Sequence, residues 1–314
     1  MCGRARCTLQ PEHIAQSIGL PIHDCSAASE YTPRNSLHPG QNVPIVVGNS
    51  LLSMTWGLIP SYQKASERLD FFMMMNARSE TVTSKNAFRR LVGRRRCVVV
   101  FEGFYEWQDR GKGGGRQPYY VHFADRRPML MAGLYDEWIG NTRQDESEKS
   151  GPIKTFTVLT TAASPRLAWL HRRMPLLLGT GEARRWLATG GDKVEGESAA
   201  ALLATLQPYN EDDLVWHPVT QRLNKIGYNE SDCAEPIELK EIPKITSFFQ
   251  QRGGAPAPAP APAKRTLSEA GANAAAERVE LKRERPERPA AASPPAPGAA
   301  AKQAAAAAAA GRDG

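Results

Sequence analysis

The sequence changes composition abruptly after Arg252. Residues 253–314 consist of Ala/Pro repeats, mixed charges and a closing alanine run, and they contain no aromatic residue. A segment of this composition cannot bury enough apolar surface to offset the conformational entropy lost on ordering. We therefore predict one globular domain over residues 2–240, a short peptide at 241–252 and a disordered tail at 253–314.

The apolar pattern before Arg252 predicts an α+β fold. Strand-like runs at 43–47 and 51–56 flank the pair Gly48-Asn49, which is typical of a tight hairpin turn. The run 97–101 is continuous and rich in valine, as in a strand that is buried on both faces. The helical stretches are short and single, so repeated βαβ units are not indicated.

The net charge of +7 and the pI of about 9.2 favour a polyanionic partner, although a solvated basic surface without a ligand fits the same numbers. The five cysteines form no CxxC pair, so neither a zinc site nor a disulfide framework is indicated, and we expect no metal or cofactor. No signal peptide and no membrane span of ~18 apolar residues is expected. We predict a monomer in a reducing compartment, the cytosol or the nucleus.

The first four residues, Met-Cys-Gly-Arg, carry the most specific chemistry. If Met1 is removed, the thiol and the α-amine of Cys2 lie on one carbon and form a 1,2-aminothiol. The amine can form a Schiff base with an aldehyde, and the sulfur can then close a five-membered ring. The alternative interpretation is that position 2 is simply a small residue that tolerates removal of Met1.

Two side chains are candidates for acid/base work. Glu106 lies between Tyr105 and Trp107 at the end of an apolar run, where desolvation would raise its pKa. It could instead be an edge-strand glutamate in solvent, and the nearby Glu102 is a rival for the buried position. His171 precedes two arginines that would keep its pKa low, although capping a helix end is a common role for such a histidine.

A basic region with aromatic residues favours single-stranded nucleic acid. Asn76 and Arg78 are two residues apart, so they face the same side of an extended segment and could supply an amide and a guanidinium fork for phosphate. The aromatic residues are Trp56, Phe104, Tyr105 and Trp107, and the arginines are Arg4, Arg6, Arg34, Arg78, Arg89, Arg90 and Arg94 to Arg96. The cluster Arg94 to Arg96 could equally be a solvated turn.

Seven motifs occur in the order found in one protein family. They are MCGR at 1–4, WGLIP at 56–60, NARSE at 76–80, GFYEW at 103–107, TTAA at 160–163, HRRMP at 171–175 and the block 219–224. Together they resemble the SOS response-associated peptidase family over roughly Cys2 to Pro236. Two positions depart from the family pattern: Gly40, where some members have Ser or Thr, and Lys225, where some have a second Asn.

The resemblance implies a β-rich, barrel-like antiparallel domain with peripheral helices and a basic cleft for single-stranded DNA. It also implies that Cys2 forms a thiazolidine crosslink with the aldehyde of an abasic site and shields the lesion during replication, with possible reversal and autoproteolytic removal of Met1. Asn76 would orient the reactants, Glu106 would move protons, and His171 would assist the Schiff-base chemistry. The implied DNA contacts are Arg4, Pro39, Trp56, Arg78 and Thr160.

Two other functions stay open at this point. The chain could be a cysteine peptidase with Cys2 as nucleophile and His171 as base. It could also be a non-covalent reader of modified cytosine in DNA. Crosslinking at abasic sites or reading of modified cytosine would each place the protein in the nucleus, at chromatin and replication forks.

Residues 242–249 (IPKITSFF) resemble the peptide that docks on the replication sliding clamp. Ile245 would fill a pocket of the clamp, with Phe248 and Phe249 beside it, through a single helical turn. The usual glutamine is Ile242 here. The alternative is a closing amphipathic turn that packs on the domain itself.

Overall fold

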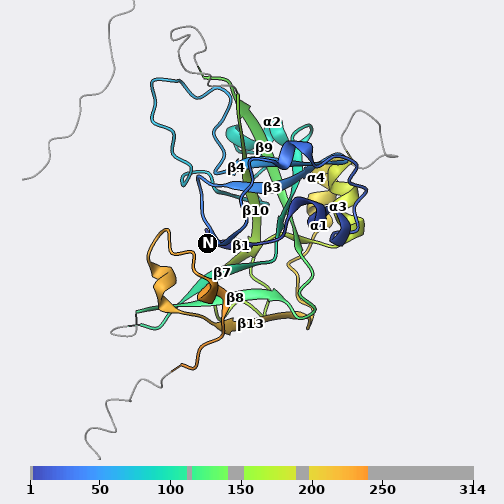
Figure 1. Ribbon diagram of the computed structural model, residues 1–314. Helices are drawn as coiled ribbons and strands as arrows, with labels where there is room; N and C mark the ends of the chain where they lie inside the picture. Colours follow the sequence, from blue (N-terminus) through green and yellow to red (C-terminus); the bar gives the residue numbers. More distant parts are fainter. Residues whose placement is uncertain (1–2, 112–114, 141–151, 189–197, 240–314) are drawn as a thin grey trace, which may run out of the picture. The chain divides into compact units, whose positions relative to one another are not determined.

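The structure is a computed structural model that describes residues 3–111, 115–140, 152–188 and 198–239. The predicted clamp-docking residues Ile245, Phe248 and Phe249, the predicted tail and Cys2 lie outside the described residues. The strands form two sheets, and Figure 1 shows β7, β8 and β13 of one sheet beside the larger sheet that contains β3, β4, β9 and β10.

Five strands of the larger sheet close into a barrel. They are β3 (Asn42–Val47), β4 (Ser50–Trp56), β6 (Arg96–Phe101), β9 (Met129–Trp138) and β10 (Ile153–Ala162). The hydrogen-bonded order is β4-β3-β6-β9-β10, and β10 returns to β4. The return pairing is parallel and the others are antiparallel. The predicted barrel-like core is therefore confirmed, with one parallel closure.

Three short strands extend the larger sheet: β5 (Asn76–Arg78), β11 (Arg173–Pro175) and β12 (Leu177–Leu178). β5 pairs in parallel with β10, which places Asn76 opposite Val158 and Arg78 opposite Thr160. β11 pairs with the same part of β10 from another side. The motifs at 76–80, 160–163 and 171–175 are thus neighbours in space.

The second sheet has the strand order β13-β8-β7-β1-β2. Its strands are β1 (Ala5–Cys7), β2 (Arg34–Leu37), β7 (Gly103–Asp109), β8 (Arg116–Phe123) and β13 (Leu214–Pro218). Only Glu102 separates β6 of the barrel from β7 of this sheet. A Cβ atom on Gly103 would lie 2.5 Å from the Val121 carbonyl oxygen, so the crossing between the sheets requires glycine there.

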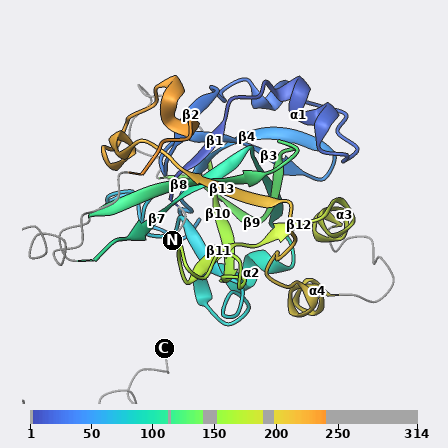
Figure 2. The same cartoon turned by 90° about the horizontal axis from the view of Figure 1, so that it is seen from below.

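The helices are short and peripheral, as predicted. They are α1 (Pro11–Ser17), α2 (Asn86–Val92), α3 (Thr180–Leu187), α4 (Ala199–Thr205) and the 3₁₀ helices η1 (Ser26–Ala28), η2 (Gln221–Asn224) and η3 (Ser231–Ala234). Figure 2 shows α3 and α4 together at one side of the strands. In the described residues no helix is long and apolar enough to cross a membrane.

Residues 165–170 form successive turns. The pair Ser164-Pro165 is a typical helix start, and from the sequence alone it predicts a short helix that ends near His171. The chain must return to pair with β10 within a few residues, and the Ala163 amide already donates to the Arg172 carbonyl at 3.0 Å. This early return limits the segment to turns and brings Trp169 and His171 near the end of β10.

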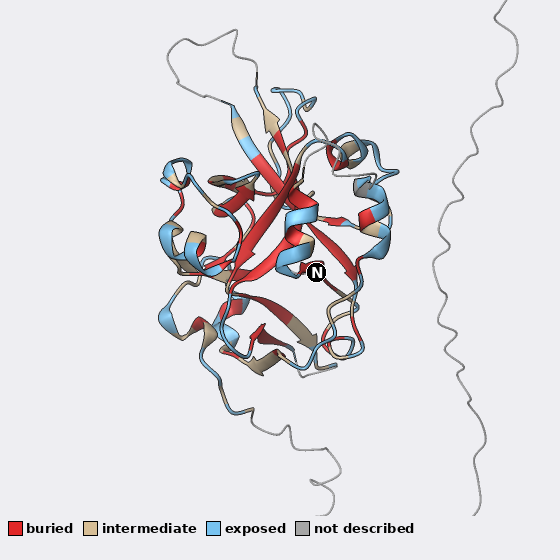
Figure 3. Ribbon diagram, turned by 90° about the vertical axis from the view of Figure 1, so that its right-hand side faces the viewer, coloured by how far each residue is buried: buried red, intermediate tan, exposed pale blue. Residues whose placement is uncertain are grey.

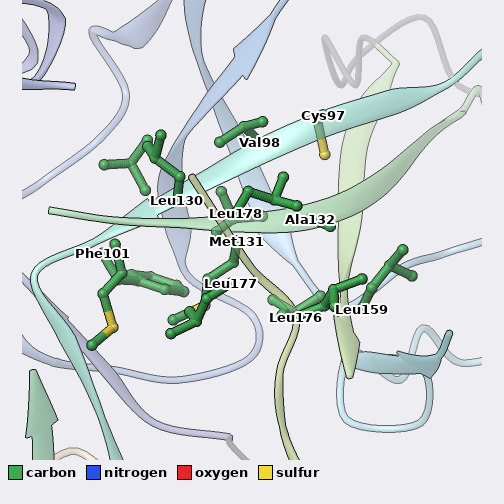
Figure 4. Packing of buried hydrophobic residues seen from close by; sticks show 14 of the residues in the cluster. Cys97, Val98, Phe101, Leu130, Met131, Ala132, Leu159, Leu176, Leu177 and Leu178 are labelled. Carbon is green, nitrogen blue, oxygen red and sulfur yellow. The ribbon is translucent and has the colours of Figure 1, made fainter. Parts of the chain in front are cut away.

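The main core fills the barrel and the space between the barrel and the second sheet. All six residues of β6 are buried, which explains the continuous apolar run in the sequence. Figure 3 shows that the strands are largely buried, whereas exposed residues predominate in helices and loops, and Figure 4 shows side chains of β6, β9 and β12 packed with Leu159 and Leu176. Burial of each large aliphatic side chain contributes roughly 1.5–3 kcal/mol to stability.

Arg96 is the exception in this buried strand. Its guanidinium group donates to the Val92 carbonyl at 2.7 Å, to the Trp186 carbonyl at 2.6 Å and to the Ala188 carbonyl. These carbonyls lie at the ends of α2 and α3, where backbone acceptors lack partners within the helix. Arg96 therefore ties two helices to the barrel, and the interpretation of Arg94 to Arg96 as one solvated or DNA-binding cluster is wrong for this residue.

We expect Gly57→Ala to destabilise the protein by about 2–4 kcal/mol, because the substitution combines backbone strain with a steric clash. Gly57 has φ of +108°, and a Cβ atom there would lie 2.0 Å from the Phe71 carbonyl oxygen. The matched control is Gly93→Ala, where φ is −81° and no atom lies within 4 Å of the new Cβ. Denaturant unfolding measures both changes, and equal stabilities of the two variants would contradict the prediction.

Candidate active site

A pocket of about 250 Å³ opens between the start of β1, the end of β2, the strands β7 and β8, and η2. It is lined by Gly3, Arg4, His38, Phe72, Met75, Glu106, Trp107, Arg116, Leu223, Asn224 and Ile226. Phe72 and Ile226 are 51% and 66% exposed, so they form an apolar rim. The pocket thus combines a carboxylate, two guanidinium groups and apolar walls.

Glu106 is the carboxylate of this pocket. It is two residues from Phe104 along β7, so the two side chains lie on the same face of the strand, and Phe104 belongs to the main core. Glu106 is 2% exposed. The Trp107 backbone amide donates to its Oε1 atom at 3.2 Å. The alternative of a solvent-exposed edge-strand glutamate does not apply to this residue.

The rival Glu102 has a structural position at the crossing between the sheets. It accepts hydrogen bonds from the Thr8 backbone amide and, at 2.9 Å, from the Thr8 hydroxyl. It also lies 4.0 Å from the Arg6 guanidinium group. Glu102 is not among the residues that line the pocket.

Arg4 is buried in the pocket wall, with 6% of the residue exposed. Its Nη1 atom donates to the Ser36 hydroxyl at 3.0 Å, and burial lowers the pKa of its guanidinium group. The Ser36 backbone amide donates in turn to Asn229 Oδ1 at 3.0 Å. Asn229, in the segment after η2, therefore anchors β2, and Ser36 of β2 anchors Arg4.

Asn76 follows Met75, which lines the pocket. The Met75 carbonyl accepts hydrogen bonds from the Trp56 indole at 3.0 Å and from the Val158 amide at 3.1 Å. This anchoring fixes the start of β5 and leaves Arg78 exposed at its other end. Asn76 is therefore adjacent to the pocket wall, and Arg78 is open to a polyanion.

His171 lies near the C-terminal end of β10, because the Ala163 amide after that strand donates to the carbonyl of Arg172, the residue after His171. The Nδ1 atom of His171 lies 3.0 Å from the Arg173 amide, which donates to it, and 3.2 Å from the Arg173 carbonyl oxygen. Arg173 also pairs with Glu80 through Nη1 and Oε1 at 2.6 Å and donates to Thr160 Oγ1 at 3.2 Å. His171 is thus oriented by the strand that follows it.

Three of the predicted DNA contacts are buried in the structure. The Trp56 ring is fully buried, 5.5 Å from the Phe101 ring and 6.3 Å from the Phe156 ring, and cannot present a face to a DNA strand. Thr160 is 1% exposed and its hydroxyl bonds within the protein. Pro39 is buried at a turn. Trp56 and Thr160 have structural roles instead, through hydrogen bonds with the Met75 carbonyl and with Arg173.

The predicted basic region is only partly open. Arg90 pairs with Asp136, and Arg95 lies 3.8 Å from Glu137 and over the Tyr135 ring. Arg34 is half-buried, whereas four of the predicted arginines are exposed: Arg78, Arg89, Arg94 and the paired Arg90. Phe104 and Tyr105 are buried, so they offer no stacking surface.

Sequence reasoning missed His38, Phe72, Arg116 and Ile226 of the pocket. The run of Phe72 and three methionines after it, set in a loop, was an available signal, because apolar side chains in a loop often mark a site. Arg116 and Ile226 had no signal of their own. In the described part of the chain, no group of three or more His, Cys, Asp or Glu side chains could hold a metal ion.

The four cysteines that the structure describes have suppressed thiol chemistry. Burial raises the pKa of Cys7 to about 12 and that of Cys233 to about 11. It also raises the pKa of Cys97 and of Cys25. Because the thiolate is the nucleophilic form, these residues are poor candidates for covalent chemistry at neutral pH.

Two relatives of this chain carry the same description. A chain named abasic site processing protein HMCES from Gallus gallus is 29% identical over 285 residues, which cover 78% of this chain and 80% of the relative. One named abasic site processing protein YoaM from Bacillus subtilis (strain 168) is 30% identical over 239 residues, which cover 75% and 98%.

Solved structures support the fold. A protein from Bacteroides thetaiotaomicron superposes with a TM-score of 0.63 at 22% identity, over 76% of this chain and all of that chain. One from Bordetella bronchiseptica gives 0.55 at 20% identity, over 70% of this chain and all of that chain. The sequence profile described as SOS response associated peptidase (SRAP) matches residues 1–226. With this match over most of the chain, the protein belongs to the SOS response associated peptidase family.

Proposed function

We propose that this protein processes abasic sites in single-stranded DNA by forming a covalent thiazolidine crosslink through Cys2. One observation carries the proposal: Gly3, which a peptide bond joins to Cys2, lines the same pocket as the buried Glu106. We infer that the aminothiol of a processed Cys2 acts at this pocket, whose lining contains a carboxylate and cationic groups. The relatives from Gallus gallus and Bacillus subtilis are both named abasic site processing proteins, which supports the same substrate.

The proposed chemistry uses an aldehyde and needs no oxidant. The Cys2 amine adds to the aldehyde carbon of the open-chain abasic sugar, and the resulting carbinolamine loses water to give an iminium ion. The Cys2 sulfur, after loss of its proton, adds to the same carbon and closes the ring. The net change is one new C–N bond, one new C–S bond and one released water.

The described residues divide the remaining tasks. Glu106 is positioned to take the thiol proton and to give one to the leaving hydroxyl. Asn76, adjacent to the pocket wall, orients the sugar, and His171 assists the Schiff-base chemistry. Arg4 gives the pocket positive charge, and the exposed Arg78 binds a flanking phosphate.

Burial raises the thiol pKa of each of the four described cysteines, so we assign the covalent chemistry to Cys2. Its reference thiol pKa is ~8.5 and that of an α-amine is ~8, so both groups are partly in their reactive forms near neutral pH. The raised pKa values of Cys7 and Cys233 argue against either as a substitute.

A denaturing gel with abasic single-stranded DNA tests the proposal. We expect Cys2→Ser to lose the stable crosslink by at least about 100-fold, since the ring needs sulfur. Cys25→Ser is the matched control, because Cys25 is partly exposed and lies outside the pocket lining, so its loss should leave the crosslink unchanged. A crosslink of unchanged stability in Cys2→Ser would refute the mechanism, and binding that survives it and depends on a modified base would favour a reader of modified cytosine.

A second candidate activity is autoproteolysis, which the family description favours. In that reaction Cys2 would be the nucleophile and His171 the base for removal of Met1 or a short leader. Mass spectrometry of a protein with a leader before Cys2 tests this activity. Leader removal that His171→Ala abolishes would support autoproteolysis, and equal removal in both proteins would contradict it.

The cellular setting stays a prediction. Action on abasic DNA places the protein in the nucleus, at chromatin and replication forks, and the peptide at 242–249 would recruit it to the sliding clamp. Deletion of 242–249 should leave crosslinking in solution unchanged and abolish clamp binding in a pull-down. A retained clamp interaction would contradict this assignment.

A further inference from the structure

Trp169 is a large aromatic residue with a partly open surface close to the pocket. It is 40% exposed, although its ring is held by two aromatic neighbours. The Tyr119 ring meets it edge-on at 5.0 Å and 85°, and the Trp216 ring lies 5.7 Å away. The indole is therefore fixed in orientation while part of it still faces solvent.

The position of Trp169 follows from the register of β7 and β8. Tyr119 is the cross-strand partner of Glu106, so the two side chains lie on the same face of the sheet. Their Cβ atoms are roughly 4.5–5.5 Å apart, as in any such antiparallel pair. Trp169 is thus separated from the pocket carboxylate by one aromatic side chain.

Charges of both signs lie near Trp169 and limit where a nucleic-acid strand could bind. Arg172 is exposed on the same turn, next to His171. Arg166 lies over the ring of Trp216, the aromatic neighbour of Trp169, and pairs with the fully exposed Asp212, beside the exposed Glu211. A nucleic-acid strand would be attracted by Arg172 and repelled by the carboxylates of Asp212 and Glu211. The surface therefore has room for a short contact next to the pocket, without an extended path.

We propose that Trp169 is a stacking platform for one unpaired base that neighbours the abasic nucleotide. The inference rests on the proposed function, because it takes the occupant of the pocket to be an abasic nucleotide. Every base has an aromatic face, so the contact would be independent of sequence. The preset orientation of the indole lowers the entropy lost on binding. A stacked base of this kind raises affinity by roughly five- to 150-fold.

The test is a binding cycle with oligonucleotides that carry a tetrahydrofuran abasic analogue, which has no aldehyde and cannot crosslink. Fluorescence anisotropy compares wild type and Trp169→Ala on three oligonucleotides: one with both neighbouring bases, one without the 5′ neighbouring base and one without the 3′ neighbouring base. We expect Trp169→Ala to weaken binding at least about fivefold on the first. Removal of one of the two neighbouring bases should abolish that difference.

Two further variants separate stacking from a loss of folding. Trp169→Phe keeps an aromatic face and should retain most of the affinity. Ile139→Ala removes another exposed apolar side chain, outside the pocket, and should bind as wild type. Thermal unfolding of each variant shows whether the fold is intact.

The proposal is overturned if Trp169→Ala binds all three oligonucleotides as wild type does, or if its effect is the same with and without each neighbouring base. A shift in oligomeric state without an effect on DNA binding would assign Trp169 to a contact between protein chains and would also overturn it. Because the analogue lacks an aldehyde, failure of crosslinking on true abasic DNA would count against the proposed chemistry and leave this result intact.

Discussion

A leader of even one residue in front of Cys2 is expected to abolish stable crosslinking to abasic single-stranded DNA. The leader converts the α-amine into an amide, which does not form a Schiff base, so the thiazolidine ring cannot close. The thiol alone can add to the aldehyde only reversibly. We expect the yield of crosslink that survives denaturation to fall at least about 100-fold, in line with removal of a covalent nucleophile.

The measurement is a denaturing gel after a chase with hydroxylamine, which captures aldehydes released from reversible adducts. The control is the same protein after protease removal of the leader, which should recover full crosslinking. A leader-bearing protein whose crosslink resists the chase would show that the amine is not required. That result would leave Cys2 a thiol nucleophile and would remove the basis for the ring.

The second large effect is expected for Glu106→Gln. Glutamine keeps the size of the side chain and can still accept a hydrogen bond from the Trp107 amide, but it cannot exchange a proton at neutral pH. We expect the single-turnover rate of crosslink formation to fall by about 100-fold or more, the usual scale for loss of a general acid or base. Binding of an oligonucleotide with a tetrahydrofuran abasic analogue should change much less.

Glu102→Gln is the matched control for this substitution. Glu102 accepts hydrogen bonds from the amide and hydroxyl of Thr8, so its loss should lower stability and leave the crosslinking rate near wild type. A slow Glu102→Gln protein beside a fast Glu106→Gln protein would reverse the two assignments.

Much of the fold could be predicted from local patterns. The continuous apolar run at 97–101 indicated a strand that is buried on both faces, and Gly48-Asn49 indicated the hairpin between β3 and β4. The parallel closure of β10 on β4 could not be predicted, because it joins residues about 100 positions apart that share no local signal. The turns at 165–170 were also missed, since the constraint comes from pairing with β10.

The choice between Glu102 and Glu106 shows why the site was harder to predict. A period of two places both side chains on one face of a single strand. The chain instead changes sheets at Glu102, so only Glu106 faces the pocket. This crossing depends on the close contact of Gly103 with Val121, which a motif does not reveal.

The sequence motifs contain residues that line the pocket and also buried residues that hold neighbouring segments in place. The Trp56 indole donates to the Met75 carbonyl, and Thr160 joins β5, β10 and Arg173, so both motif residues have structural roles. Arg116 and Ile226 reach the pocket only through the long-range approach of β8 and the segment after η2. Sequence patterns identified which segments matter, and the structure separates the side chains that line the pocket from those that hold them.

The intact mass of the protein after reaction with abasic single-stranded DNA tests the central claim most directly. The account predicts one adduct whose mass equals the protein without Met1 plus the oligonucleotide minus one water, with its modification on the N-terminal peptide, and stable without a reducing agent. An adduct that appears only after borohydride reduction, or one that maps to a lysine, would contradict it.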